Sequence, residues 1–308
     1  MRSITVQAPA SVANMVCGFD ILGMALEAPF DQMQLNLLNE RKIIIEHTDQ
    51  YNLPVEPEKN VAGAALISMM QELNEEVGFQ LTVHKHIKPG SGLGSSAAGS
   101  AGAVVAANKL LGDRFSNEDL VRFAMAGEKV ASGVKHADNI APCIYGGITL
   151  IRSIFPLDIV QVPSPPMYVT AVHPQIEVKT SDARQILRKE VLLKDAIRQW
   201  GNIAGLVAGL LKSDYDLIGR SLEDVIIEPV RSVLIPGFDV LKKQCIAAGA
   251  LGGGISGSGP SVFMLSRDEH TAARVKTIME SVYESLKIEH KTYLTRVNNE
   301  GVKVVERY

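Results

Sequence analysis

The chain has 308 residues, of which 46% are hydrophobic and 21% are charged, and its formal net charge is −3. A chain of this length can form two domains of ordinary size, each with its own core. Its slightly acidic balance gives no broad basic surface, so nucleic acid is not an expected partner. The sequence has no run of about 18 apolar residues and no basic-then-apolar leader. We therefore expect no membrane segment and a cytoplasmic location.

The three cysteines, Cys17, Cys143 and Cys245, are odd in number and far apart in the sequence. This spacing argues against a disulfide framework and against a cysteine-based zinc site. We interpret all three as reduced thiols. Cys17 falls in a loop of the expected site, but a small buried side chain is the simpler interpretation of it.

Apolar periodicity predicts a series of strands and helices in the first half of the chain. A polar loop from Pro9 to Asp20 follows the first strand, and a second polar loop runs from Ala131 to Pro142. Loops at such positions can project side chains into a site. Asn60 and Ser116 are the expected N-caps of two helices. The expected strands are 3–8, 32–38, 42–47, 79–87 and 148–152, and the expected helices are 60–77, 95–111 and the segment after Ser116.

A glycine- and serine-rich stretch, Lys88-Pro89-Gly90-Ser91-Gly92-Leu93-Gly94-Ser95-Ser96-Ala97-Ala98, joins the strand at 79–87 to a helix of small residues. The first turn of a helix has free N–H groups and the positive end of the helix dipole, and glycines let an anion reach the backbone. Ser95 and Ser96 add hydroxyls that can cap the helix, contact phosphate or bind Mg²⁺. The stretch therefore predicts a phosphate-binding loop. The simpler alternative is an ordinary strand-to-helix turn with a serine cap.

This phosphate-binding loop is not a Walker A loop, because the pattern Gly-x-x-x-x-Gly-Lys-Ser/Thr does not occur in the sequence. Within the helix that follows, Gly99 and Gly102 each cost about 1 kcal/mol relative to alanine. We therefore expect another part of the molecule to approach this helix closely.

The second half of the chain begins after a cluster of prolines between Val162 and Pro166, which interrupts any regular element. We divide the chain into domains 1–162 and 163–308. Both halves mix helices and strands without a strict repeat, which favours the α+β class. In the second half the expected strands are 168–173, 250–256, 261–265, 292–297 and 302–306, and the expected helices are 190–211, 238–248 and 269–286 with a further helix start at 180–184.

A later glycine cluster, from Gly252 to Pro260, contains the pattern Gly-x-Gly-x-x-Gly that is associated with dinucleotide binding. That fingerprint needs a helix directly after the glycines, whereas Pro260 leads into an expected strand. A nicotinamide or flavin enzyme is therefore a weak alternative. A glycine loop between two strands can instead lie against a neighbouring loop or a ligand.

Three motifs in this order resemble the GHMP kinases, a superfamily of small-molecule kinases that includes galactose, homoserine, mevalonate and phosphomevalonate kinases. The motifs are Pro9-Ala10-Ser11-x-x-Asn14 with Gly18-Phe19-Asp20, then Pro89 to Ala98, and then Gly252-x-x-x-Ser256-Gly257-Ser258-Gly259-Pro260. The block from Gly127 to Pro142 and the block from Glu228 to Phe238 resemble the homoserine kinase branch. The resemblance covers nearly the whole chain.

This resemblance implies a two-domain GHMP-kinase fold of the α+β class. Its N-terminal half would be a nucleotide-binding domain similar to a ribosomal-protein domain, with a left-handed crossover, and its C-terminal half would be ferredoxin-like. The implied reaction is transfer of the γ-phosphate of ATP to the side-chain hydroxyl of L-homoserine, a step toward threonine. ATP, Mg²⁺ and a homodimer are also implied. The alternatives are another small-molecule kinase of the superfamily and a non-catalytic nucleotide-binding regulator on the same fold.

The resemblance also assigns residues by position. Ser96 and Glu128 would hold Mg²⁺, and Asn60 would lie near the adenine. A zwitterionic substrate needs an acid for its ammonium and arginines for its carboxylate, which Asp20, Arg184 and Arg231 would supply. The implied ATP-binding residues are Asn60, Pro89, Gly90, Ser91, Gly92, Leu93, Gly94, Ser95 and Ser96. The implied homoserine-binding residues are Asn14, Asp20, His136, Asn139, Arg184, Arg231 and Gly254.

The implied catalytic residues are Asp20, Ser96, Glu128 and Asn139. Where sister kinases place an aspartate base, this chain has Asn139. Because phosphoryl transfer depends mainly on positioning and charge neutralisation, we expect Asn139 to orient the hydroxyl and not to accept its proton. Taken singly, these polar residues have simpler interpretations as helix caps, turn residues or members of surface ion pairs. The family usually has Gly-Pro-Gly before Phe-Asp, whereas this chain has Met15-Val16-Cys17-Gly18, so we expect a different path for this loop.

Overall fold

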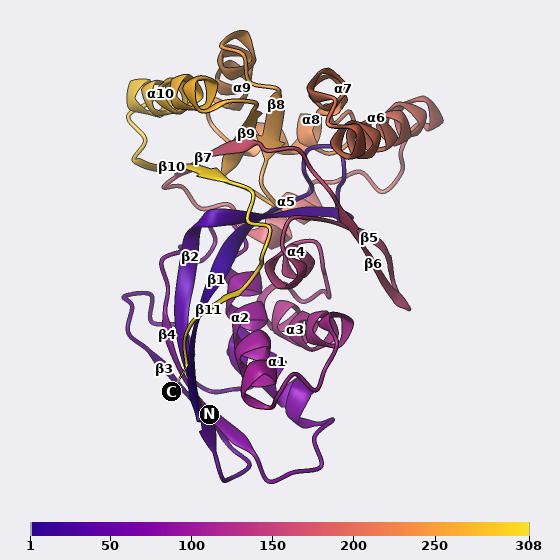
Figure 1. Ribbon diagram of the computed structural model, residues 1–308. Coiled ribbons are helices and arrows are strands. Elements are labelled where there is room, and N and C mark those ends of the chain that lie inside the picture. Colours follow the sequence, from indigo (N-terminus) through magenta and orange to yellow (C-terminus); the bar gives the residue numbers. More distant parts are fainter. Residues whose placement is uncertain (1, 308) are drawn as a thin grey trace.

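The computed structural model describes residues 2–307, apart from the side chains of Ser132, Ser181 and Arg307. The chain forms two layers built on separate sheets, one above the other in Figure 1. Ser132 belongs to one of the motifs above and Ser181 to an expected helix start, so these two side chains lie outside the description.

The lower sheet, within residues 2–307, has seven strands in the order β11-β1-β2-β4-β3, with β5 paired to β2 and β6 paired to β5. β3 runs parallel to β4, and the other pairs are antiparallel. The strands are β1 (Ser3–Ala13), β2 (Leu22–Leu38), β3 (Ile43–His47), β4 (Gly78–His84), β5 (Ile148–Ile154), β6 (Leu157–Val162) and β11 (Lys303–Arg307).

Helices α1 to α4 cover one face of this lower sheet (Figure 1). They are α1 (Val61–Met70), α2 (Ser95–Leu110), α3 (Asn117–Ser132) and α4 (Ile140–Tyr145). Asn60 caps α1 by accepting hydrogen bonds from the N–H groups of Ala62 and Gly63. Ser116 and Asp119 form the capping box of α3, as the sequence predicts.

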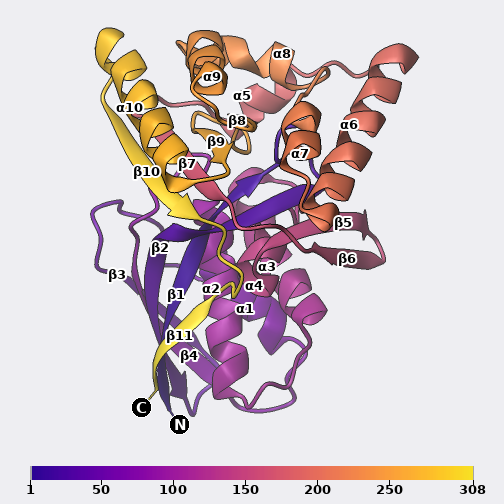
Figure 2. The ribbon, with the colours of Figure 1, turned by 45° about the horizontal axis from the view of Figure 1, so that its top comes forward.

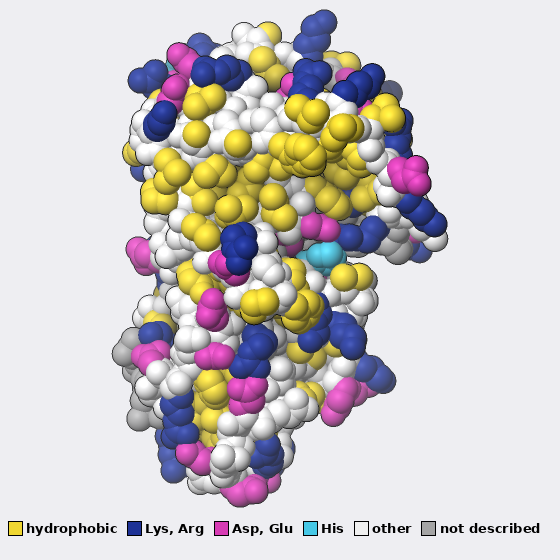
Figure 3. Space-filling view, turned by 90° about the vertical axis from the view of Figure 1, so that its right-hand side faces the viewer, with side chains coloured by type: hydrophobic (Ala, Val, Ile, Leu, Met, Phe, Trp, Pro, Cys, Tyr) yellow, Lys and Arg dark blue, Asp and Glu magenta, His cyan; other side chains and the backbone are white. Residues whose placement is uncertain are grey.

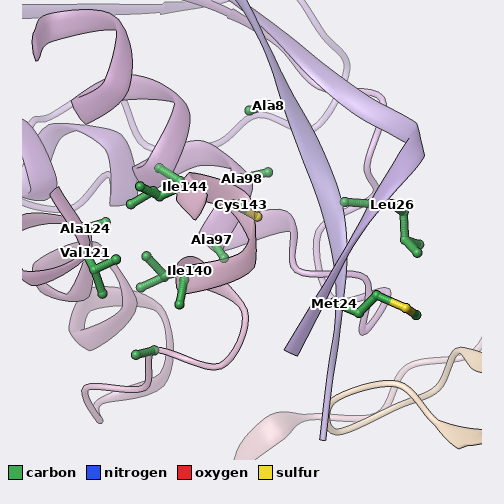
Figure 4. Close-up of a cluster of buried hydrophobic side chains, with 14 of the residues drawn as sticks. Ala8, Met24, Leu26, Ala97, Ala98, Val121, Ala124, Ile140, Cys143 and Ile144 are labelled. Carbon is green, nitrogen blue, oxygen red and sulfur yellow. The ribbon is translucent and has the colours of Figure 1, made fainter. Parts of the chain in front are cut away.

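The small residues of α2 allow it to lie in the middle of the lower layer. A Cβ at Gly102 would lie 2.7 Å from Met33 Sδ, and one at Gly99 would lie 2.9 Å from Val61 Cγ2. The predicted close approach to this helix is therefore confirmed. Figure 4 shows Ala97 and Ala98 of α2 between the side chains of α4 and the strands of the sheet.

The upper layer is built on a second sheet, in the order β10-β7-β9-β8. Helices α9 and α10 cover it from above (Figure 1), and Leu241, Val275 and Tyr283 are buried between the helices and the sheet. The strands are β7 (Tyr168–Pro174), β8 (Gly252–Ile255), β9 (Val262–Ser266) and β10 (His290–Arg296). The helices are α5 (Thr180–Gln185), α6 (Leu193–Lys212), α7 (Tyr215–Ser221), α8 (Glu228–Arg231), the 3₁₀ turn η1 (Ser232–Leu234), α9 (Phe238–Ala247) and α10 (Glu269–Ser285).

The last strand connects the two layers. Figure 2 shows the chain passing from β10 in the upper layer down to β11, which ends close to the N-terminus. β11 pairs antiparallel with β1, from Gln7↔Lys303 to Ile4↔Arg307. Residues beyond 163 therefore contribute a strand to the lower sheet, and the division at 162/163 stays a prediction.

Several elements differ from the sequence-based expectations. The expected loop from Pro9 is strand as far as Ala13, because a register shift between Pro9 and Ser11 accommodates the proline. β2 begins at Leu22 and not at residue 32, and α1 ends at Met70 and not at residue 77.

Five short elements, β6, α4, α7, α8 and the 3₁₀ turn η1, were not expected. α4 begins inside the polar loop expected at 131–142, continues to Tyr145 and has Pro142 in its first turn. A proline is tolerated in the first turn of a helix, so the helix begins before it. The α+β class itself is confirmed.

Candidate active site

A cavity of about 420 Å³ lies where the two layers meet. It is lined by residues from the loops that follow β1 and β4, from the starts of α1 and α2, from the end of α3, and from α5 and α8. Most of the expected site residues line this one cavity. They are Asn14, Asp20, Asn60, Pro89, Gly90, Gly92, Gly94, Ser95, Ser96, Glu128, His136, Asn139, Arg184 and Arg231.

The phosphate-binding loop has a backbone that favours glycine. Gly90, Gly92 and Gly94 have φ angles of 75°, 80° and 69°, in the left-handed region. Gly94 is the N-cap of α2 and provides no side-chain cap, so the positive end of this helix faces the cavity. The loop can therefore hold an anion through its backbone. Ser95 is not the cap that the alternative interpretation needs, because its hydroxyl donates to Ile87 O at 2.8 Å.

Neighbouring segments hold the phosphate-binding loop in place. Ser256 Oγ donates to Gly92 O at 2.6 Å, and Ser261 Oγ donates to Ser91 O at 2.6 Å. Leu93 O accepts from the backbone N–H of Ser11 at 3.1 Å. Ser91 and Leu93 are buried and do not line the cavity. The later glycine cluster thus lies against the phosphate-binding loop, which is one of the two uses that the sequence suggested for it.

Ser96 and Glu128 form a pair of oxygen ligands at the cavity wall. Ser96 Oγ donates to Glu128 Oε2 at 2.9 Å, which joins the first turn of α2 to α3. A hydroxyl and a carboxylate suit Mg²⁺, which prefers oxygen ligands and shares them with nucleotide phosphates. In the described part of the chain no cluster of three or more His, Cys, Asp or Glu residues could hold a metal by itself. The donor set therefore fits a metal that is bound together with phosphate.

Lys85 also lines the cavity, although the sequence analysis did not select it. Its ammonium pairs with the buried carboxylate of Asp31 and donates to Ser95 O at 3.1 Å. Asp31 in turn accepts the backbone N–H groups of His86 and Ile87, at 2.8 and 2.9 Å. This buried pair fixes the end of β4 against β2 and places a positive charge beside the phosphate-binding loop.

The cavity has an apolar end that adjoins the cap of α1. Leu53, Pro54 and Val83 line it, together with His47 and Asn60. Asn60 Nδ2 donates to Pro54 O at 2.6 Å and lies 3.1 Å from His47 Nε2. Asn60 is therefore both the N-cap of α1 and a wall residue, and its two interpretations from the sequence are compatible.

Asn139 and His136 project from the loop between α3 and α4. Asn139 Oδ1 accepts the hydroxyl of Ser11 at 2.8 Å, which leaves the Nδ2 group of the same amide as a donor. His136 Nδ1 lies 3.8 Å from Asp20 Oδ1, and its Nε2 is buried without a hydrogen-bond partner among the described residues. Burial, reinforced by the charge of Arg184, lowers the pKa of His136. The imidazole is therefore a neutral group at pH 7.

Two arginines and one aspartate form the charged end of the cavity. Arg184 pairs with Asp20 at 3.0 Å, and Arg231 Nε donates to Ala183 O at 2.9 Å. Both guanidinium groups lie over the ring of Phe19, with centroid distances of 5.6 and 5.0 Å. Burial, together with the charge of Arg184, lowers the pKa of Arg231 to about 10, which leaves it charged at pH 7.

Asn14 holds the loop that carries Asp20. Its side-chain oxygen accepts the backbone N–H of Asp20 at 3.0 Å, and its Nδ2 donates to Gly257 O at 2.8 Å. Asn14, Met15 and Val16 have φ angles of 72°, 40° and 68°. This left-handed run ends at Val16, the first of the three residues Val16-Cys17-Gly18 that stand where the family usually has Gly-Pro-Gly. Asn14 and Asp20 still line the cavity.

Gly254 is the one expected substrate-binding residue that does not line the cavity. It lies in β8, where a Cβ would come within 2.4 Å of Glu228 Oε2. Glu228 begins α8, the helix that carries Arg231. The absence of a side chain at Gly254 therefore makes room for α8, and any effect on the substrate would pass through that helix.

Asp138 is a buried carboxyl in the cavity wall that the sequence analysis did not select. Burial, reinforced by the negative charges of Asp20 and Glu128, raises the pKa of Asp138 to about 7. Its Oδ1 accepts the backbone N–H of Asn139 at 3.2 Å. Asp138 becomes buried only when the chain folds. Apart from its position next to Asn139, nothing in the sequence indicated that it belongs to the site.

Comparisons with known proteins agree with this geometry. The family model for the N-terminal domain of GHMP kinases matches residues 60–147, and the model for their C-terminal domain matches residues 206–285. A homoserine kinase of Chloroherpeton thalassium is 43% identical over 99% of this chain and 100% of its own length. A homoserine kinase of Chlorobium phaeobacteroides is also 43% identical, over 99% of this chain and 100% of its own length. The chain belongs to the homoserine kinases of the GHMP kinase family.

The crystal structure of a homoserine kinase from Cytophaga hutchinsonii has the same fold, with a TM-score of 0.95 and 47% identity over 99% of this chain and 98% of that one. The N-terminal GHMP model contains Asn60, the phosphate-binding loop, Glu128 and Asn139, and the C-terminal model contains Arg231 and Gly254. Both matched regions thus contribute to the one cavity. No helix in residues 2–307 is both long and apolar enough to cross a bilayer.

Proposed function

We propose that this chain transfers the γ-phosphate of ATP to the side-chain hydroxyl of L-homoserine and forms O-phospho-L-homoserine, a step toward threonine. One observation carries the proposal. A single cavity contains a backbone anion site, an oxygen pair suited to Mg²⁺ and a charged end made of one aspartate and two arginines. The first two features suit a nucleotide, and the third suits an amino acid.

At the nucleotide end, the N–H groups of the phosphate-binding loop and of the first turn of α2 would bind the phosphates, with Lys85 beside them. The hydroxyl of Ser96 and the carboxylate of Glu128 would hold Mg²⁺, which neutralises phosphate charge when it is bound. The apolar end at Leu53 and Val83 would receive the base. These groups position ATP without any Walker lysine.

At the amino-acid end, Arg184 and Arg231 would bind the substrate carboxylate, and Asp20 would bind its ammonium. The Nδ2 donor of Asn139 would orient the hydroxyl oxygen, since Oδ1 is already bonded to Ser11. The substrate oxygen then forms a bond to the γ-phosphorus while the bond from that phosphorus to the ADP oxygen breaks. The hydroxyl proton leaves with solvent or phosphate, because positioning and charge neutralisation carry most of the catalysis.

The same proposal includes a cytoplasmic location, a homodimer and no nucleic-acid partner. The net charge of −3 supports the last of these. The direct test is to identify the product after incubation with Mg-ATP and L-homoserine, by phosphorus NMR and mass spectrometry. We expect one phosphomonoester of homoserine for each ADP formed. ADP without a phosphorylated amino acid would show ATP hydrolysis and contradict the assignment of the acceptor.

A further inference from the structure

A buried glutamine of α6 joins the two segments that carry charged groups of the site. α6 lies on the side of the molecule that Figure 3 shows, with a broad band of hydrophobic side chains across the upper part of this view. Gln199 does not belong to this surface, because only 5% of it is exposed. Its Nε2 donates to Cys17 O at 2.8 Å and to Asp224 Oδ1 at 3.1 Å. Its Oε1 accepts the backbone N–H of Val225 at 3.1 Å.

The partners of Gln199 require a neutral amide. Cys17 O and Asp224 Oδ1 are acceptors, whereas the N–H of Val225 is a donor. A glutamine side chain offers two N–H groups and one oxygen, so it serves all three partners at once. A glutamate would set its carboxylate against both acceptors, and an apolar side chain would leave buried polar groups unpaired. The network therefore makes specific use of glutamine at this position.

The first of the two segments is the loop between β1 and β2. Cys17, whose carbonyl oxygen is bonded to Gln199, lies three residues before Asp20. Within the loop the N–H of Gly18 donates to Asn14 O at 2.8 Å, and the N–H of Asp20 donates to Asn14 Oδ1 at 3.0 Å. These bonds hold the loop as one tight turn. A bond that fixes Cys17 against α6 therefore also restricts the position of Asp20.

The second segment leads into α8 and is held by Asp224, which is 6% exposed. Asp224 Oδ1 accepts the backbone N–H groups of Ile226 and Ile227, at 2.8 and 2.9 Å. Asp224 Oδ2 accepts the backbone N–H of Glu228 at 3.0 Å. The carboxylate thus satisfies free N–H groups at the start of α8. Arg231 is the last residue of this four-residue helix, so Asp224 fixes the backbone from which Arg231 extends.

The same two segments also meet at the cavity wall. Gly257 O accepts Asn14 Nδ2 at 2.8 Å and Arg231 Nη1 at 3.1 Å, and Gly257 lines the cavity. Gln199 does not line the cavity, so it joins the loop and α8 at a second point, away from the substrate. Two points of attachment restrict both the distance and the angle between the loop and α8.

We propose that Gln199 is a positioning residue that holds Asp20 where one amino acid can reach both Asp20 and Arg231. The inference rests on the proposed function, because it takes these two residues as partners of the substrate ammonium and carboxylate. Both substrate groups are attached to the same carbon atom, so the spacing of their partners has to match a fixed distance. Partners that are already in place bind more tightly than partners that the substrate itself has to order.

The first variant is Gln199→Met, which nearly keeps the volume of the side chain and removes its hydrogen bonds. We expect the KM for L-homoserine to rise about 10-fold, with kcat and the KM for ATP changed less than about twofold. The control is Asn202→Leu on the same helix, since Asn202 Nδ2 donates at 2.8 Å to the oxygen of Glu223, the neighbour of Asp224 in the sequence. The control should leave all three constants unchanged. Steady-state kinetics with each substrate varied in turn measures them.

Two fragments of homoserine separate positioning from a general loss of structure. The fragment γ-hydroxybutyrate lacks the ammonium and can use only the arginines, whereas 3-aminopropanol lacks the carboxylate and can use only Asp20. Because neither fragment binds to both segments, its inhibition constant against L-homoserine should change less than about twofold in Gln199→Met. A weakening of both fragments as large as that of homoserine would show a damaged site and overturn the positioning role.

Asp224→Asn tests the same network from its other end. Its new amide nitrogen would face the N–H of Glu228, donor against donor, so we expect the same selective rise in the KM for homoserine. Circular dichroism melts confirm that each variant is folded. An unchanged KM for homoserine in both variants overturns the inference and leaves the proposed function intact. If the unmodified chain releases no ADP in response to L-homoserine, the proposed function itself is wrong and the inference is wrong with it.

Discussion

Asp20 and Arg184 are 164 positions apart in the sequence and form a two-point ion pair, in which Arg184 Nη2 lies 3.0 Å from Oδ1 and 3.2 Å from Oδ2 of the carboxylate. These are the groups proposed to bind opposite ends of the substrate. Each is about one third exposed, so the pair itself adds little to stability. A zwitterion can replace this contact by offering its ammonium to Asp20 and its carboxylate to Arg184. The ion pair thus holds both side chains in place until the ammonium and the carboxylate of the substrate replace their contact with each other.

The first prediction concerns this exchange. Arg184→Leu should raise the KM for homoserine about 10- to 100-fold, because it removes a charged partner of the substrate carboxylate. The KM for ATP should change less than about twofold, since Arg184 lies at the amino-acid end. The control is Arg188→Leu, an exposed arginine four residues later. Steady-state kinetics with each substrate varied in turn checks this, and a selective effect on ATP would reassign Arg184.

The second prediction concerns the oxygen pair at the nucleotide end. Glu128→Gln should lower kcat and raise the Mg²⁺ concentration needed for half-maximal rate by about 10- to 100-fold. Glu118→Gln, an exposed acid in the first turn of the same helix, is the matched control and should leave both unchanged. Measuring the reaction rate of both variants at increasing Mg²⁺ concentrations and a fixed ATP concentration tests this prediction. An unchanged magnesium dependence in Glu128→Gln would remove this residue from the ligand set.

The third prediction concerns the glycines of the phosphate-binding loop. At Gly92, φ is 80° and a Cβ would lie 2.6 Å from Gly259 O, which is backbone and cannot move cheaply. Gly90 has a similar φ of 75°, but a Cβ there would meet nothing within 4 Å. Gly90→Ala should therefore cost only about 1 kcal/mol of unfolding free energy, and Gly92→Ala about 3 kcal/mol. Urea denaturation measures the unfolding free energy of both variants. Equal losses of unfolding free energy would mean that the later glycine cluster does not pack tightly against Gly92.

The fourth prediction concerns Asp138, whose pKa is raised from 3.8 to about 7 by burial and by the charges of Asp20 and Glu128. The folded chain binds the proton of the Asp138 carboxyl more tightly than the unfolded chain, so proton binding at Asp138 adds to the free energy of unfolding. This stabilising contribution is complete below pH 3.8 and is lost as the pH rises through about 7. Asp138→Asn cannot ionise and should therefore gain on the order of 2–4 kcal/mol of unfolding free energy relative to the unmodified chain at pH 8. Near pH 4 the difference should be small.

Urea denaturation of the Asp138→Asn variant at several pH values measures this gain. Asp113→Asn, at an exposed position after α2, is the control and should show no pH-dependent gain. A constant difference between Asp138→Asn and the unmodified chain at all pH values would mean that Asp138 is not a carboxyl with a raised pKa.

Local sequence was enough to predict the glycine-rich turn between β4 and α2. Glycines with no strand or helix preference, followed by small helix-forming residues, leave few other structures for the segment from Gly90 to Gly102. Asn60 and Ser116 could be predicted as caps for the same reason, because the capping hydrogen bond joins residues two or three positions apart. These features depend on neighbours in the sequence.

The features that sequence reasoning missed depend on distant contacts. Lys85 acquires its place from Asp31, 54 residues away, and Asp138 acquires its raised pKa from burial in the folded chain and from the charges of Asp20 and Glu128. The left-handed run at Asn14, Met15 and Val16 was also beyond prediction, since none of these residues is glycine. Its hydrogen bond from Asn14 to Gly257, 243 residues later, forms only when the two layers meet.

The measurement that tests the central proposal most directly is ADP release from the purified chain with Mg-ATP and a panel of alcohols that includes L-homoserine, mevalonate, galactose and L-serine. We predict release that depends on L-homoserine and falls when Arg184 or Glu128 is replaced as above. Release with mevalonate or galactose but not with L-homoserine would contradict the account of the charged end of the cavity, and binding of ATP without release for any alcohol would contradict a catalytic role altogether.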